Sequence, residues 1–120
     1  MAYSTIPKGS LYMNTKTYTG TGSAMNITGV GFQPDMTWIK PRSVVDNHIL
    51  YDAVRGVSSR LIPNLDSAAG TVSDMVTSFN SDGVSLGTNG NVTANGVTFA
   101  GWSWKAGTSF TNDASGTGIG

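Results

Sequence analysis

The sequence contains no cysteine and no glutamate, and it has only one histidine and one glutamine. Without cysteine there is no disulfide framework, no thiol nucleophile and no cysteine-based metal site. Because Glu, Gln and Lys are scarce, the polar residues that best favour helices are largely missing. Seven aspartates balance seven Lys and Arg to a formal net charge of zero, and charged residues make up only 12% of the chain. This composition gives no electrostatic basis for binding nucleic acid or an anionic membrane.

Long hydrophobic runs are also missing. No stretch approaches the roughly 20 apolar residues of a membrane span, and the N-terminal "MAYSTIPKGS" has no apolar core of signal-peptide length. We therefore expect a protein made in the cytoplasm without a signal peptide, and one that does not insert into a membrane. A length of 120 residues allows one domain with a core of moderate size.

Residues that favour strands and turns dominate the remaining composition. Gly, Thr, Ser and Asn make up 54 of the 120 residues. Thr and aromatic residues favour strands, whereas Gly, Asn and Ser favour tight turns. Hydrophobic residues at 38%, with 11 aromatics among them, argue against disorder. Seven or so short strands, with turn signals every 8–12 residues or so, are typical of a β-sandwich or barrel. We predict an all-β fold, a sandwich of two antiparallel sheets.

Turn residues delimit the individual strands. The predicted strands are residues 11–19, 25–32, 36–40, 48–54, 75–79, 84–87 and 97–107. The third is framed by Pro34-Asp35 and by Pro41, and a strand does not continue easily through a proline because proline lacks the N–H of the ladder. "NSDG" predicts a hairpin turn with positive φ supplied by Asp82-Gly83. "TNGNVTANG" is expected to be a flexible connection.

Three segments are expected along the chain. Residues 1–17 are interpreted as an N-terminal arm and first strand, and residues 18–107 as the β-sandwich domain. Residues 108–120 are rich in Gly, Ser and Thr and resemble a linker or tail. We expect the natural polypeptide to continue past this segment.

The tryptophans are assigned to the core. Trp102 and Trp104 are two positions apart, so their side chains lie on the same face of a strand, together with Ala100. Phe99 and Gly101 occupy the opposite face. We predict that the tryptophan side is buried. The alternative is an exposed platform on which sugar rings stack.

Trp38 is predicted to be core as well, with Met36 beside it on the strand framed by the prolines.

No catalytic constellation is recognisable. The single histidine, His48, opens a strand beside a polar turn, and the chain has no G-x-S-x-G nucleophile elbow. The aspartates mostly occupy turn contexts, and Asp52, within a strand, has a local partner in Arg55. We predict no catalytic residue.

Metal binding has only weak support. Asp46-Asn47 and the stretch 80–83 offer oxygen ligands for calcium, but neither has the full spacing of a loop site. We predict no metal and no cofactor.

Four blocks in order resemble a concanavalin-like, lectin-like β-sandwich module of bacteriophage tail-fibre and virion-surface proteins. They are "YTGTGSAMNITGVGFQPDMTWIKPRS", "HILYDAVRG", "TSFNSDGVSLG" and "FAGWSWKAG". The resemblance implies a jelly-roll sandwich and a non-enzymatic virion structural protein, such as a tail fibre or a capsid-decoration or tail-surface component. "MAYSTIPKGSLYMN" also looks like a natural start of such a protein. Pro41 departs from the pattern, which leads us to expect a small polar residue there.

The resemblance also implies partners. These are other virion proteins and copies of the chain itself, in a homo-oligomer for which a trimer is expected by analogy with fibres. The arm would add a strand to a neighbour's sheet edge. The resemblance also implies a contribution to host attachment. The alternative function is a carbohydrate-binding module for host-surface glycans, with Tyr12, Tyr18 and Tyr51 as candidate contact residues.

Overall fold

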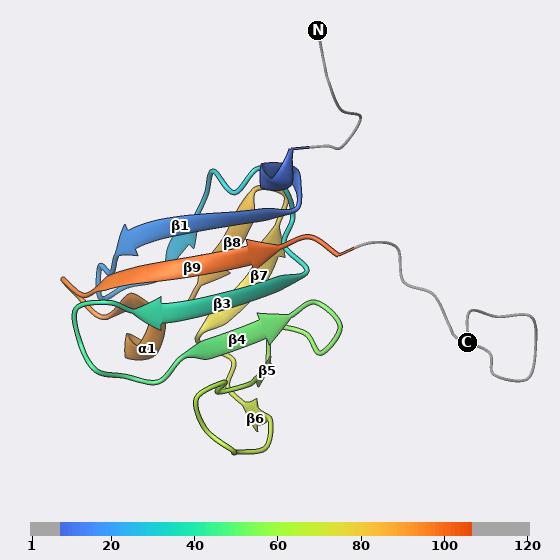
Figure 1. Cartoon of the computed structure of the whole chain (residues 1–120). Helices are drawn as coiled ribbons and strands as arrows, with labels where there is room; N and C mark the ends of the chain where they lie inside the picture. Colours follow the sequence, from blue (N-terminus) through green and yellow to red (C-terminus); the bar gives the residue numbers. More distant parts are fainter. Residues whose placement is uncertain (1–7, 107–120) are drawn as a thin grey trace, which may run out of the picture.

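A computed structural model of the chain describes residues 8–106. These residues form nine strands, one 3-10 turn and one short α-helix (Figure 1). In chain order the elements are η1 (Gly9–Leu11), β1 (Met13–Thr19), β2 (Met25–Ile27), β3 (Met36–Pro41), β4 (Ile49–Asp52), β5 (Ser59–Arg60), β6 (Gly70–Thr71), β7 (Val76–Asn80), β8 (Gly83–Leu86), α1 (Gly90–Thr93) and β9 (Thr98–Trp104).

The strands form two main antiparallel sheets. Sheet A has the order β1-β9-β3-β4, and sheet B has the order β2-β8-β7. Strands β5 and β6 form a small separate ladder. Sheet B lies behind sheet A in the view of Figure 1. The predicted all-β, antiparallel fold is confirmed, while the jelly-roll connectivity stays a prediction.

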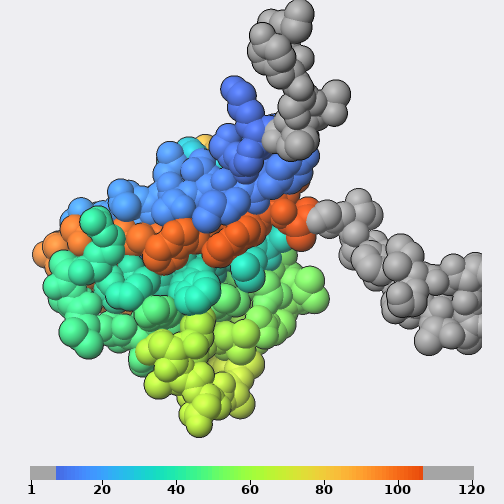
Figure 2. Space-filling model, in the orientation of Figure 1, coloured from blue at the N-terminus to red at the C-terminus, as the bar shows by residue number. Residues whose placement is uncertain are grey.

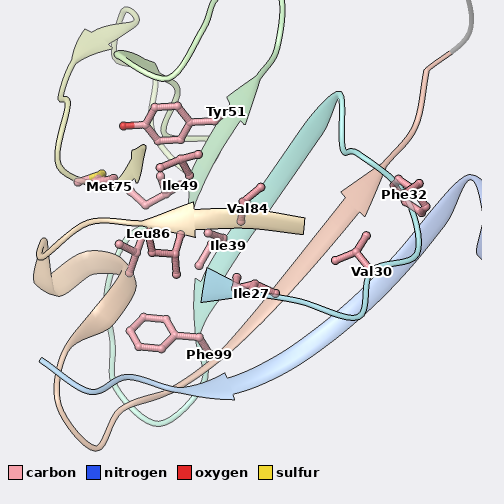
Figure 3. Close-up of a cluster of buried hydrophobic side chains, with 12 residues drawn as sticks. Ile27, Val30, Phe32, Ile39, Ile49, Tyr51, Met75, Val84, Leu86 and Phe99 are labelled. Atoms are coloured by element: carbon pink, nitrogen blue, oxygen red, sulfur yellow. The ribbon is translucent and has the colours of Figure 1, made fainter. Parts of the chain in front are cut away.

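The hydrophobic core lies between the two sheets (Figure 3). Sheet A contributes Ile39, Ile49 and Phe99, and sheet B contributes Val84 and Leu86, all at most 1% exposed. Burying a side chain of this size stabilises the fold by about 1.5–3 kcal/mol. The buried hydrophobic residues are aliphatic residues, phenylalanine, tyrosine and Met75, with no tryptophan among them.

The assignment of the tryptophans to the core is wrong. On β9 the buried face consists of Phe99, Gly101 and Ser103, whereas Trp102 and Trp104 are half-buried on the opposite, outer face. A Cβ at Gly101 would lie 3.7 Å from the side chain of Ile27 of the facing sheet, which is ordinary van der Waals contact, so Ile27 already fills the space over Gly101.

Strand β3 shows the same inversion. Thr37 and Ile39 point inward, while Met36 and Trp38 are half-buried on the outer face. The hydroxyl groups of Thr37 and Ser103 are buried and 3.1 Å apart, which satisfies both of them inside the domain.

The prediction that the third strand ends at Pro41 is confirmed, since β3 spans Met36–Pro41. The N–H of Arg42 bonds to Thr98 of β9, so by alternation the position of Pro41 faces the β4 side. The last pair between β3 and β4 is Ile39 with Ile49. Pro41 therefore lacks its N–H at a position where the pairing with β4 has already ended, so no carbonyl of β4 loses a donor.

The predicted hairpin at 75–87 is confirmed as β7 and β8. No non-glycine residue in the described part of the chain has positive φ, so Gly83 but not Asp82 adopts it. The expectation of a flexible connection at residues 88–96 is wrong. Helix α1 forms there because Asn89 caps it by accepting the N–H of Asn91, and because Val92 is buried.

The expected boundary between residues 17 and 18 falls inside β1. This strand pairs with β9 along its whole length, from Met13 to Thr19, so the first strand belongs to the sandwich. Residues 1–7 of the expected arm and the expected linker at 108–120 lie outside the described residues. Within residues 8–106, no helix has the length and apolar character to cross a membrane.

Candidate functional site: the tryptophan face

The outer surface of sheet A carries all three tryptophans of the chain. We call this surface the tryptophan face. Strand register sets its side chains in two neighbouring rows that cross the sheet from β1 to β4. One row is Met13, Trp104, Met36 and Asp52, and the other is Thr15, Trp102, Trp38 and Leu50. Figure 2 views this side of the molecule, with the side chains of β9 between those of β1 and β3.

Trp38 is held in a fixed orientation at the centre of the face. Its indole N–H donates a hydrogen bond to Nδ1 of His48, with the two nitrogens 3.2 Å apart. A bond accepted at Nδ1 leaves Nε2 as the donor nitrogen of the imidazole. The ring of Trp38 also meets Trp102 edge to face, at 6.4 Å between centroids and 71° between planes.

The other two indoles keep their polar edges available. Trp38 is the one tryptophan whose N–H has a protein partner within residues 8–106. Trp102 and Trp104 are both partly exposed. The face therefore combines aromatic planes with indole donors that have no acceptor within residues 8–106.

The two rows carry one charged side chain, Asp52. Its carboxylate pairs with Arg55, with Oδ2 2.6 Å from Nε. Lys40 lies on the border of the face, beside Ala100. Its ammonium donates to the carbonyl of Pro41 at 3.0 Å and keeps its positive charge. The rows themselves therefore carry no unpaired charge.

Amide side chains border the face beside His48. The backbone N–H of His48 donates to Oδ1 of Asn64, and the amide of Asn64 donates to Oδ1 of Asn47. Asp46 accepts from the amide of Asn91 at 3.3 Å. Asp46 and Asn47, considered from the sequence as calcium ligands, thus bind amide groups of the protein.

The second calcium candidate, residues 80–83, also makes protein contacts. The carboxylate of Asp82 accepts the backbone N–H groups of Gly29 and Gly31. Asn80 donates to the hydroxyl of Ser85. In the part of the chain that the structure describes, no three His, Asp or Glu side chains gather as a metal-binding group.

The three tyrosines predicted to contact glycans are not brought together. Tyr51 is fully buried and donates its hydroxyl to Val72, so it is inaccessible to a sugar. Burial raises the pKa of Tyr51 to about 12; Arg60 opposes this increase and Asp74 adds to it. Only the side chain of Tyr12 is well exposed, at 48%.

Tyr18 lies largely in the interior. Its ring stacks on Phe99 with centroids 5.1 Å apart, and its hydroxyl donates to the carbonyl of Val92 at 2.7 Å. Burial raises the pKa of Tyr18 well above its ordinary value.

The carboxylates within the described residues are engaged at separate places. Asp35 accepts the N–H of Ala106, and Asp74 accepts the amide of Asn89. Asp52 pairs locally with Arg55, so these acids contact different parts of the chain and do not converge on one site. What the geometry assembles in one place is aromatic surface, which suits binding.

Fold and surface together define a β-sandwich domain with an aromatic outer sheet face. The model of one family, Domain of unknown function (DUF7483), matches residues 8–118, and the chain belongs to this family. The comparisons with curated proteins and with solved structures find no match.

Proposed function

We propose that this chain is a non-enzymatic structural component on the outer surface of a bacteriophage capsid or tail, where it assembles with other virion proteins and contributes to host attachment. The resemblance to phage surface modules supports this proposal. Its four sequence blocks supply part of β1, the whole of β2, β3, β4 and β8, and most of β7 and β9. The resemblance therefore extends over the strands that build both sheets.

The tryptophan face is the observation that carries the proposal. The core between the sheets is complete without the tryptophans, as Phe99 and Ile39 fill it. Large aromatic side chains on an outer sheet surface are typical of a surface used for binding. The domain therefore offers an aromatic surface suited to holding a partner.

Strand β1 supports the assembly part of the proposal, because it is an edge strand of sheet A. Lys105 donates to Tyr12, and Gly20 donates to Val97, so the even-numbered residues of β1 bond to β9. The N–H groups of the odd-numbered residues therefore point away from the sheet. The side chain of Asn14 accepts the N–H of Thr15, which leaves those of Thr17 and Thr19 for an added strand.

The first experiment locates the chain in the particle. Particles of a phage that encodes the chain are purified, analysed by mass spectrometry and labelled with gold-conjugated antibody. We expect the chain on the outside of intact capsids or tails. Finding the chain only in the infected-cell lysate would reject the virion role.

A second experiment tests the edge of β1 with Thr17→Pro. Proline at this position removes an outward N–H and leaves the bonds to β9 intact, so the domain should still fold. Incorporation into particles should fall, as it should on deleting residues 1–10. The matched control is Val45→Ser, an exposed apolar position outside the sheets, which should incorporate normally. Normal incorporation of Thr17→Pro and of the deletion would refute assembly through this part of the chain.

A further inference from the structure

We propose that the tryptophan face is a binding site for a neutral oligosaccharide, with Trp102 and Trp104 stacking on pyranose rings. This inference rests on the host-attachment part of the proposed function, for which it names the ligand class. It places the site on the outside of sheet A, away from Tyr18 and Tyr51, which face the interior.

The chemistry of the face matches that of a sugar. The faces of an indole carry negative partial charge, and the C–H groups on one side of a pyranose ring carry positive partial charge, so the two surfaces attract when stacked. A sugar also needs hydrogen-bonding groups around that apolar contact. The N–H groups of Trp102 and Trp104 have no acceptor within residues 8–106, and Nε2 of His48 remains as a donor since Nδ1 accepts from Trp38.

The two rows favour an uncharged ligand. Their one charged side chain, Asp52, is paired with Arg55, so a cationic ligand finds no free carboxylate in them. An acidic glycan finds no cation in the rows and reaches one only at Lys40 on the border, where the ammonium keeps its charge while donating to a backbone carbonyl. A neutral polyol requires neither contact.

The size of the aromatic area fits a few sugar rings better than a protein. Four strands about 4.8 Å apart give a width of about 15 Å, and side chains two positions apart on one strand are about 7 Å apart. Two such rows cover roughly 200 Å², compared with about 800 Å² that each partner buries in a stable protein interface. Among the candidate occupants, the oligosaccharide is therefore the one whose dimensions match.

Trp38 acts as a positioning residue in this site. Its bond to His48 and its edge-to-face contact with Trp102 fix the orientation of the ring that Trp102 packs against. Trp38→Phe keeps an aromatic ring but cannot donate to the imidazole. We expect this variant to bind more weakly while keeping the same preference among glycans.

The test uses the full chain and its own fluorescence. All three tryptophans lie on the proposed site, so tryptophan emission reports on this face alone. A glycan array is screened first, and cellohexaose, maltohexaose and a sulfated heparin hexasaccharide are then titrated with emission and acrylamide quenching as readouts. We expect binding to neutral glycans, protection from the quencher, and weaker binding to the sulfated probe.

Matched variants locate the site. Trp102→Ala and Trp104→Ala should each weaken binding about tenfold or more, the equivalent of losing roughly 1.4 kcal/mol. Tyr12→Ala removes an exposed aromatic ring from outside the two rows and should change affinity less than about twofold. Circular dichroism confirms that each variant is folded.

Three results would overturn the inference. They are no binding to any arrayed neutral glycan, loss of binding in Tyr12→Ala but not in the tryptophan variants, and a dimer in sedimentation velocity that Trp102→Ala dissolves. The last result would assign the face to a second copy of the chain. Trp102→Ala should still be incorporated into particles. If the wild-type chain is incorporated normally but binds no glycan, the glycan site is rejected and the virion role is retained.

Discussion

The carboxylate Oδ1 of Asp82 accepts a hydrogen bond of 2.7 Å from the backbone N–H of Gly31, which lies 51 residues away in the sequence. The second carboxylate oxygen accepts the N–H of Gly29 at 2.8 Å, and the carbonyl of Asp82 accepts that of Val30 at 3.1 Å. Both glycines have positive φ, which turns their N–H groups toward one anion. One residue at the tip of the β7–β8 hairpin thus anchors the whole loop that follows β2.

This anchor makes stability depend on pH. The hydrogen bonds from Gly31 and Gly29 lower the pKa of Asp82 below its ordinary value of 3.8. The charged form is favoured in the folded state, so the stabilisation is complete above the unfolded pKa and is lost as the pH falls through the lower folded pKa. Asp82→Asn should therefore lower the melting temperature at neutral pH and lessen its decline in acid.

Thermal unfolding followed by circular dichroism from about pH 2 to pH 7 measures this dependence. The control is Asp66→Asn, a change at an exposed loop position. Wild-type and Asp82→Asn curves that stay parallel over the whole range would show that the anchor does not contribute through its charge.

A methyl group at Gly83 should be strongly destabilising. A Cβ there would lie 1.9 Å from the carbonyl oxygen of Ile27 in the neighbouring strand, so the backbone must move. We expect Gly83→Ala to lower the free energy of unfolding by about 3 kcal/mol or more. Gly90→Ala is the matched control, since nothing lies within 4 Å of its Cβ position, and it should stay within about 0.5 kcal/mol of wild type. Urea denaturation gives both values, and similar midpoints would contradict the close approach of β2 and β8.

The buried tyrosines should make the domain sensitive to alkali. Burial raises the pKa of both Tyr18 and Tyr51 above the ordinary value of 10.0, so the folded state favours the neutral phenols. Their contribution is complete below about pH 10 and is lost as the pH rises through the folded values. Tyr18→Phe with Tyr51→Phe should flatten the alkaline decline, and each change should cost about 1 kcal/mol at neutral pH through a lost hydrogen bond. Chemical denaturation across this range tests it, and Tyr12→Phe should match wild type.

The two faces of β9 should respond very differently to truncation. Phe99 is fully buried between the sheets, and Phe99→Ala should lower the free energy of unfolding by about 3–5 kcal/mol. Trp102 is half-buried on the outer face, so Trp102→Ala should cost less than about 2 kcal/mol. Equal losses in urea denaturation would mean that the tryptophan face is as closely packed as the core.

Local residue chemistry allowed much of the fold to be predicted. Strand β3 ends at Pro41, one residue beyond the predicted strand, and the turn before Gly83 produces the β7–β8 hairpin. The sequence did not predict helix α1, because its four residues have poor helix propensity. The cap at Asn89 and the burial of Val92 against the core stabilise it, and the second of these depends on tertiary contacts.

The tryptophan face was likewise predictable only in part from the sequence. Because side chains alternate along any strand, the sequence alone places Trp102 and Trp104 on one side of β9 and Phe99 with Gly101 on the other. The packing of sheet B on sheet A decided which side is the interior, since the side chain of Ile27 from sheet B occupies the space over Gly101. Alternation is a local property of the backbone, whereas the inward direction depends on how the two sheets pack against each other in the folded domain.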